Sequence, residues 1–176
     1  MIDIRRATVA DCTTIHDLAW RIFPATYSEI LTKEQSDYMM EWMYSLDSLH
    51  RQMADGHVYF IALSDGEPIG YVSVSKESED LFHLQKIYVL PSMQGTGCGR
   101  LLFDRAVEHI RSLHPSPCRM ELNVNRHNKA LEFYKRMGMT IARQGDFAIG
   151  QGYYMNDFIM SLDILPQKEH YGRNKE

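Results

Sequence analysis

The sequence predicts an α/β domain in which helices flank a mixed, mostly antiparallel sheet. Apolar residues recur at helical spacing up to about residue 54 and then alternate as in strands from His57 onward. The turn-forming segment 64–68 (SDGEP) separates two apolar runs and predicts a hairpin. A strand, an amphipathic helix and a further strand then follow one another over 81–124, which is the order of a parallel crossover unit.

The first third of the chain predicts a short strand and two helices. Alternating apolar residues begin the strand at Ile2. Asp11 can cap a helix over 11–23, and Pro24 would end it because a residue that precedes proline avoids helical backbone. A methionine-rich apolar stripe predicts a second, longer helix over 32–54, with its methionines packed in the core.

The remaining elements follow from the same periodicities. The expected strands are 58–63, 69–75, 81–90, 120–124, 139–147 and 153–162. The expected helices are 97–114, with apolar residues at i, i+3 and i+4, and 128–137, which Gly138 would cap. We expect one domain over 1–165, followed by a polar tail over 166–176.

Composition narrows the class of protein. The chain has 176 residues, 44% of them hydrophobic and 24% charged, which suits a globular domain with its own core. No apolar segment suggests a signal peptide or a membrane helix, so we expect no membrane partner. The net charge of −4 and the absence of a dense basic run argue against nucleic acid as a partner.

Cysteine and histidine spacing predicts reduced thiols and no metal. The three cysteines cannot all pair and match no zinc pattern, so we expect a cytoplasmic protein. His109 and His114 are spaced so that they do not share a helix face, and neither HExxH nor CxxC occurs.

The most informative segment is a glycine-rich turn between the strand 81–90 and the helix 97–114. Gly95, Gly97 and Gly99 alternate there, and glycine permits the backbone conformations that turn several N–H groups toward one point. The N-terminus of a helix also favours an anion. The turn therefore predicts a pyrophosphate cradle, although a glycine-rich entry to a helix is the alternative.

Two other phosphate motifs do not fit these residues. A P-loop ends in Gly-Lys-Ser/Thr, whereas this turn ends in Gly99-Arg100-Leu101. A dinucleotide fingerprint needs a third glycine where Arg100 stands.

The spacing Gln94-x-x-Gly97-x-Gly99 after a strand resembles motif A of the GNAT superfamily of N-acetyltransferases. The segment 125–139 (NRHNKALEFYKRMGM) is similar to motif B of the same family. The two motifs occur in the family's order. The resemblance implies a central sheet splayed between its fourth and fifth strands, and transfer of an acetyl group from acetyl-coenzyme A to an amine.

The resemblance also implies a set of cofactor-binding residues. Strand backbone would pair with the pantetheine arm, turn amides would hold the pyrophosphate, and the motif B asparagine would bond the arm. These residues are Ile87, Tyr88, Val89, Gln94, Gly95, Thr96, Gly97, Cys98, Gly99, Arg100 and Asn128. Asn128 could equally be an N-terminal helix cap.

Two side chains are candidates for proton transfer. Tyr134 matches the family tyrosine that protonates the departing thiolate, although on spacing alone it could be a core residue. His83 occupies the position of the glutamate base of histone-acetylating relatives, and its near-neutral pKa suits a proton relay, although a surface histidine is the alternative. Asn123 stands where ribosomal-protein-acetylating relatives have a glutamate, and it cannot ionise.

The acceptor is less well defined. Glu121, Asp146 and Asp157 are reserve candidates for the base, and Asp157 lies in a polar-aromatic patch that could flank a cationic amine or form an exposed strand face. A loose likeness to a bacterial branch with polyamine acetylators favours a small primary amine. Peptide amines and a non-catalytic acyl-coenzyme A sensor are the alternatives. Plentiful aromatic and methionine side chains, together with the many dimeric family members, favour a homodimer.

Overall fold

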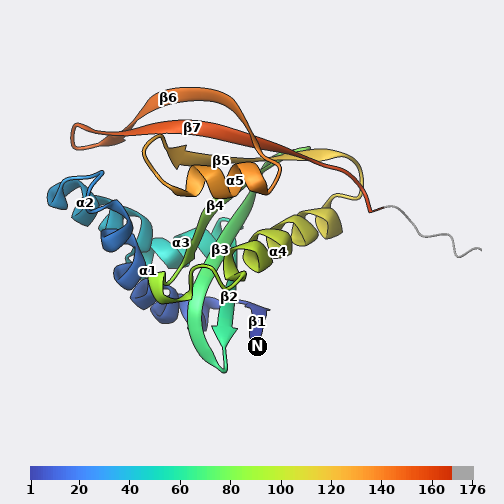
Figure 1. Ribbon diagram of the computed structural model, residues 1–176, viewed down its shortest axis with the longest axis horizontal. Coiled ribbons are helices and arrows are strands. Elements are labelled where there is room, and N and C mark those ends of the chain that lie inside the picture. The colour runs from blue at the N-terminus through green and yellow to red at the C-terminus, as the bar shows by residue number, and fades with distance from the viewer. Residues whose placement is uncertain (168–176) are drawn as a thin grey trace, which may run out of the picture.

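A single seven-stranded sheet organises the chain, with the strand order β1-β2-β3-β4-β5-β7-β6 (Figure 1). The computed structural model describes residues 1–167, so most of the tail expected over 166–176 lies outside the described residues. The strands are β1 Ile2–Arg6, β2 Val58–Ser64, β3 Glu67–Ser78, β4 Leu81–Val89, β5 Cys118–Asn125, β6 Thr140–Gly150 and β7 Tyr153–Ile164. The predicted α/β fold with a mixed, mostly antiparallel sheet is confirmed.

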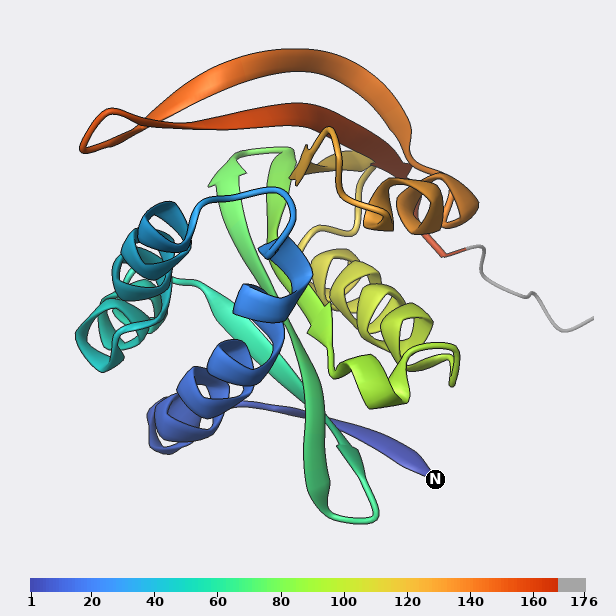
Figure 2. The ribbon, with the colours of Figure 1, turned by 60° about the vertical axis from the view of Figure 1, so that its left-hand side comes forward.

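Helices cover both faces of the first part of the sheet. The helices are α1 Cys12–Tyr27, α2 Lys33–Tyr44, α3 Leu46–Ala54, α4 Cys98–Leu113 and α5 Ala130–Arg136, with short 3₁₀ turns at Val9–Asp11 and Pro91–Met93. Figure 2 shows α1, α2 and α3 on one side of the strands and α4 on the other. Strands β2 and β3 are therefore buried on both faces, which explains their near-continuous apolar runs.

The sheet opens between β4 and β5. These two strands are parallel and are joined through α4, as the crossover unit predicts. They pair only where Leu81, Phe82 and His83 face Arg119, Met120 and Glu121, and they separate beyond that point. The expected splay between the fourth and fifth strands is confirmed.

A long hairpin of β6 and β7 completes the sheet. β7 pairs with the whole length of β5, and β6 forms the edge. β6 continues to Gly150 at the hairpin turn, beyond its predicted end at 147, and the turn extends past the body of the sheet (Figure 1). β7 begins at Tyr153 as predicted and continues to Ile164, beyond its predicted end at 162. Its tip approaches α2, where the side chains of Gln35 and Tyr38 bond backbone carbonyls of Tyr154 and Ile149.

The predicted end of the first helix at Pro24 is wrong. Helix α1 continues through Pro24 to Tyr27. The proline removes one N–H donor, and the carbonyl that loses it belongs to Trp20, whose side chain is on the exposed side of the helix. The last turn buries Phe23 and Tyr27. We attribute the continuation to that burial, which outweighs the lost hydrogen bond.

The single helix predicted over 32–54 is also wrong. Ser45 has extended backbone and separates α2 from α3. Its hydroxyl accepts a hydrogen bond from the backbone N–H of Ser48 at 3.2 Å, which makes it the N-cap of α3. Because the apolar stripe continues across the break, periodicity alone does not predict the break. Met39 and Met40 pack in the core, as expected.

Candidate active site

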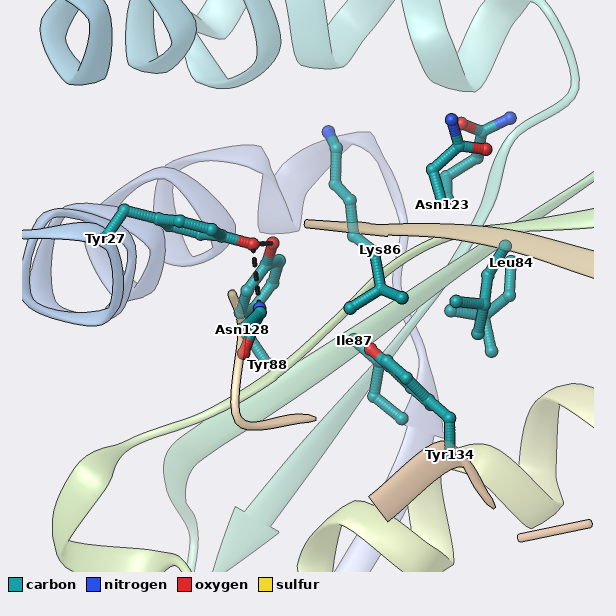
Figure 3. Close-up of a pocket in the computed structure, with 11 residues that line it drawn as sticks. Tyr27, Leu84, Lys86, Ile87, Tyr88, Asn123, Asn128 and Tyr134 are labelled. Carbon is teal, nitrogen blue, oxygen red and sulfur yellow. Dashed lines mark hydrogen bonds between the residues drawn. The ribbon is translucent and has the colours of Figure 1, made fainter. Parts of the chain in front are cut away.

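A narrow slot lies where β4 and β5 separate (Figure 3). It measures about 20 Å³. Its walls come from the two strands and from three side chains on α1, on α5 and in the loop before α5. The lining residues are Leu84, Gln85, Lys86, Ile87, Tyr88, Leu122, Asn123, Val124, Tyr27, Asn128 and Tyr134. Because β4 has no partner strand beyond His83 on this side, its backbone edge is open to an extended ligand.

The glycine-rich turn follows directly from β4 and leads into α4. Gly95 and Gly97 have φ values of +83° and +86°, which favour glycine, and Gly97 is the N-cap of α4. A Cβ placed on either glycine would meet nothing within 4 Å, so the turn faces open space. The structure thus brings the predicted residues 94–100 together at one helix N-terminus, as an anion cradle requires.

Cys98 lies inside the turn but is not a reactive group. Its side chain is buried, and burial raises the pKa of the thiol to about 11. The thiol is therefore protonated at neutral pH, and its contribution is to the packing of α4. All three cysteines are free, as the sequence predicts.

Asn128 connects the start of α5 with the slot. Its side-chain oxygen accepts a hydrogen bond from the backbone N–H of Ala130 at 2.9 Å, and its amide donates to the hydroxyl of Tyr27 at 3.2 Å. The hydroxyls of Tyr27 and Tyr88 share a further hydrogen bond of 3.0 Å (Figure 3). Asn128 therefore holds the first turn of α5 and also lines the slot.

Tyr134 lies on α5 with its hydroxyl directed into the slot, beside Ile87 (Figure 3). The residue is 7% exposed, and burial raises its pKa above the ordinary value for tyrosine. The phenol is therefore protonated at neutral pH and can act as a proton donor. Tyr134 is both a core residue and a slot residue, so the two interpretations hold together.

A larger cavity of about 520 Å³ adjoins the slot. Helices α1, α2 and α3 line one side, and the hairpin of β6 and β7 lines the other. The slot and the cavity share the side chains of Tyr27, Gln85, Lys86, Tyr88 and Asn123. Half of the lining residues are apolar or aromatic, namely Phe23, Tyr27, Leu31, Met39, Trp42, Met43, Tyr88, Phe147, Ile149, Tyr154 and Met155. Such a cavity suits a small organic molecule.

His83 lines this larger cavity, not the slot. Its Nδ1 lies 3.0 Å from a carboxylate oxygen of Glu77, which also lines the cavity. Burial lowers the pKa of His83, while the charges of Glu77 and Glu121 act in the opposite direction. The imidazole is thus neutral at neutral pH and can accept a proton.

The three reserve carboxylates have different environments. Glu121 is buried in a two-pronged ion pair with Arg143, with both distances 3.0 Å, and Asp146 is exposed and bonded to Arg126 at 2.8 Å. Neither of them lines the cavity. Asp157 does line it and is 1% exposed, whereas Tyr154 and Asn156 of the same patch are exposed, so the alternative of an exposed strand face holds for those two positions and not for Asp157.

Sequence reasoning missed two charged residues that line the cavity, Lys86 and Glu77. The ammonium of Lys86 donates to the hydroxyl of Tyr59 at 2.7 Å, to Gln52 at 2.8 Å and to the carbonyl of Met43 at 3.2 Å, and it lies 4.3 Å from the centre of the Tyr44 ring. Burial lowers the pKa of Lys86 to about 7. The sequence does hold a signal for Lys86. It stands at an alternate position of β4, in line with Phe82 and Leu84, and those positions face the core.

Within residues 1–167, no cluster of His, Cys, Asp or Glu side chains could hold a metal ion. In the same part of the chain no helix is long and apolar enough to cross a bilayer.

Comparison with known proteins identifies the family to which this arrangement belongs. The model of the acetyltransferase (GNAT) domain matches residues 28–144. An uncharacterized N-acetyltransferase of Mycobacterium bovis is 28% identical over 105 residues, which cover 59% of this chain and 65% of that protein. A peptidyl-lysine N-acetyltransferase of Salmonella typhimurium is 30% identical over 89 residues, or 49% of this chain and 53% of that protein. The chain thus spans less than two thirds of the length of these relatives.

Solved structures share the fold. The PaiA N-acetyltransferase from Thermoplasma acidophilum, in complex with coenzyme A, superposes with a TM-score of 0.75 at 22% identity, over 92% of this chain and 98% of that one. The ribosomal-protein-S18-alanine N-acetyltransferase from Escherichia coli gives a TM-score of 0.71 at 17% identity, over 97% and 98%. The resemblance that motifs A and B indicate is confirmed by the family model, and the chain belongs to the GNAT superfamily of acetyltransferase domains.

Proposed function

We propose that this chain transfers an acetyl group from acetyl-coenzyme A to a small primary amine. The observation that carries the proposal is the continuity of three features: an open turn of amides at the start of α4, an unpaired edge of β4, and a slot into which the phenol of Tyr134 points. An anion, an extended amide chain and a thioester sulfur would need these features in this order.

The residues present fit coenzyme A. Gly95 and Gly97 leave the concave side of the turn free of side chains, and the N-terminal amides of α4 favour the diphosphate. The edge of β4 at Ile87 and Val89 offers backbone groups to the pantetheine amides, and Asn128 offers its side-chain amide. When bound, acetyl-coenzyme A supplies an activated acetyl thioester.

Tyr134 is proposed as the general acid. A phenol is protonated at neutral pH, and this one is directed into the slot, so it can give its proton to the departing sulfur. Its burial beside Ile87 of β4 limits the access of bulk water to that transfer. A side chain with the same ring but no hydroxyl would keep the packing and lose the proton.

His83 is proposed as the general base, with Glu77 holding its orientation. The Glu77 carboxylate oxygen 3.0 Å from Nδ1 favours the tautomer with its proton on Nδ1, which leaves the free lone pair on Nε2. Because His83 lines the cavity and not the slot, the proton of the acceptor would reach it through water.

The cavity favours a small cationic acceptor, such as a polyamine. Two carboxylates, Glu77 and Asp157, line it among aromatic walls. The one lysine in its wall, Lys86, already donates to three oxygen acceptors and presents little free charge. The hydrogen bonds from α2 to the hairpin tip close the cavity on one side, which suits a small molecule better than a protein surface.

A peptide or protein amine is the second candidate. One relative is named a peptidyl-lysine N-acetyltransferase and one structural neighbour acts on a ribosomal protein. The absence of an ionisable group at Asn123 counts against a close parallel with the latter. A non-catalytic acyl-coenzyme A sensor would need no acid in the slot, so Tyr134 counts against that alternative. The homodimer stays a prediction.

Two measurements test the proposal. Calorimetry with acetyl-coenzyme A should give heat of binding, and a thiol-release assay with polyamines, amino acids and peptides should give turnover with at least one small amine. The absence of any heat of binding with acetyl-coenzyme A would contradict the proposal. Binding without turnover across the panel would favour the sensor, and turnover with peptides alone would favour the second candidate.

A further inference from the structure

We propose that Asp157 binds the ammonium group of the acceptor beside the slot and makes the cavity selective for protonated amines. This inference rests on the proposed function and adds a residue that determines the class of acceptor. It concerns binding of the amine, and leaves the later loss of its proton to the proposed base.

The position of Asp157 places its carboxylate next to the slot. The residue lies on β7 opposite Asn125 of β5, and one of its oxygens accepts a hydrogen bond of 3.2 Å from the side-chain amide of Asn123. Asn123 lines both the slot and the larger cavity. A group bound at Asp157 is therefore separated from the slot by a single side chain.

The carboxylate lacks the partners that its burial demands. An ionised carboxylate offers about four acceptor positions. Within residues 1–167, Asn123 is its one hydrogen-bond donor, although the residue is only 1% exposed. Burying a charged group with so few partners is costly, so the site is incomplete until a donor enters from the cavity.

The nearby cations do not complete it. The guanidinium of Arg126 bonds Asp146 and the carbonyl of Gly145, and it acts on Asp157 only through its field. The ammonium of Lys86 is held by Tyr59, Gln52 and Met43. Burial raises the pKa of Asp157, against the effects of Asn123 and Arg126, as expected for a carboxylate that still lacks a cation.

An alkylammonium ion matches both the carboxylate and its surroundings. It brings up to three N–H donors to the free acceptor positions. Its hydrocarbon part can lie against Phe147, Tyr154 and Trp42, which line the same cavity. A carboxylate-bearing acceptor would be repelled by Asp157 and would find Lys86 already occupied.

The test compares Asp157→Asn with two further variants. Asp157→Glu keeps the charge, and Asp163→Asn removes an exposed carboxylate from β7 outside the cavity. Each variant is assayed with acetyl-coenzyme A and a matched pair of acceptors, benzylamine, which is cationic at neutral pH, and aniline, which is neutral.

We expect Asp157→Asn to lose its selectivity for the cationic acceptor. For Asp157→Asn, kcat/KM with benzylamine should fall by on the order of 100-fold, mainly through KM, because one partner of a buried charge pair is removed. The value with aniline and the affinity for coenzyme A should stay within about 3-fold. Asp157→Glu should recover part of the loss, and Asp163→Asn should match the wild type.

Other outcomes separate the inference from the function. Wild-type kinetics for Asp157→Asn with benzylamine, with coenzyme A still bound, would overturn the inference and leave the acetyltransferase intact. A wild-type chain that binds no coenzyme A would remove the function itself.

A second measurement covers the case in which Asp157→Asn does not fold. Butylammonium and butanol are then compared as competitive inhibitors of the wild-type chain against the acceptor. The cation should bind at least about 10-fold more tightly, as one charged hydrogen-bonded contact implies. Equal inhibition by the two would overturn the inference.

Discussion

The phenol of Tyr134 allows one atom of the candidate site to be tested alone. Tyr134→Phe keeps the ring that packs against Phe133 and removes the proposed proton donor. We expect kcat to fall by about 100-fold or more, the usual contribution of a general acid, with little change in coenzyme A affinity or thermal stability. Steady-state kinetics and calorimetry measure these effects.

A matched control for that substitution is Tyr153→Phe, since Tyr153 stacks on Tyr38 near the hairpin tip. It should leave kcat unchanged. If the two variants behaved alike, Tyr134 would be a packing residue and the acid would have to be sought elsewhere.

His83 predicts a pH dependence. A base must be neutral to act, and burial lowers the pKa of this imidazole below its ordinary value of 6.5. The wild-type kcat should therefore stay level through neutral pH and fall only below about 6.5. His83→Gln should lower kcat by about 100-fold, and the fall of kcat at acidic pH should disappear. A variant that keeps most of its kcat across neutral pH would exclude His83 as the base.

At the scale of single residues, the sequence predicted which residues form the candidate site but not which side chains they contact. Tyr134, Asn128 and the turn residues were found from motif spacing. In the structure Tyr134 and Asn128 line one slot, and the turn residues gather at the N-terminus of α4. The contact between Asn123 and Asp157 joins residues on different strands, and no local pattern encodes it. The register of β5 against β7 decides it.

At the scale of elements, the turn before α4 depends on glycine backbone. Gly97→Ala would place a side chain on a residue with φ of +86°, at a cost of about 1–2 kcal/mol, and would re-aim the amides of the cradle. We expect lower thermal stability together with at least about 10-fold weaker binding of coenzyme A. Thermal unfolding and calorimetry test the two effects.

Gly66→Ala provides the matched control. Gly66 has φ of +84° in the turn between β2 and β3, and, like Gly97, it has open space where a Cβ would lie. This variant should lose similar stability and bind coenzyme A normally. Unaltered binding by Gly97→Ala would contradict the cradle.

Element boundaries were less predictable than element types. The strands and helices expected from periodicity are present, but α1 runs through Pro24 and the second helix is broken at Ser45. At Pro24 tertiary burial outweighs a local preference, whereas at Ser45 a local N-cap interrupts the helix although the apolar stripe continues. Apolar periodicity reports which face is buried, and it does not report where the backbone turns.

At the scale of the whole molecule, the ion pair of Arg5 and Asp11 predicts how stability varies with pH. Asp11 accepts two hydrogen bonds from Arg5, at 2.9 and 2.8 Å, and one from the backbone of Thr8. These contacts lower the pKa of Asp11 from 3.8 to about 2. Because the folded value lies below the unfolded one, the stabilisation is present above about pH 4 and is lost as the pH falls through about 2.

Asp11→Asn should therefore reduce the free energy of unfolding by about 1 kcal/mol at pH 7, the upper end for an ion pair with access to solvent. The difference from the wild type should shrink toward zero near pH 2. Asp37→Asn, which removes the exposed pair with Lys33, should change little at either pH. Denaturant titrations at both pH values measure this, and a difference that did not vary with pH would exclude the ion pair as its cause.

The sequence by itself determined the family, the mixed sheet, the crossover through α4 and the glycine-rich turn before α4, because each depends on residues that are near one another along the chain. Tertiary structure alone decided which charges meet: His83 with Glu77, Asn123 with Asp157, and Lys86 with the tyrosines around it. Those pairings depend on strand register and on helices packed across the sheet. Burial then sets the pKa of each group, and burial is a property of the folded chain.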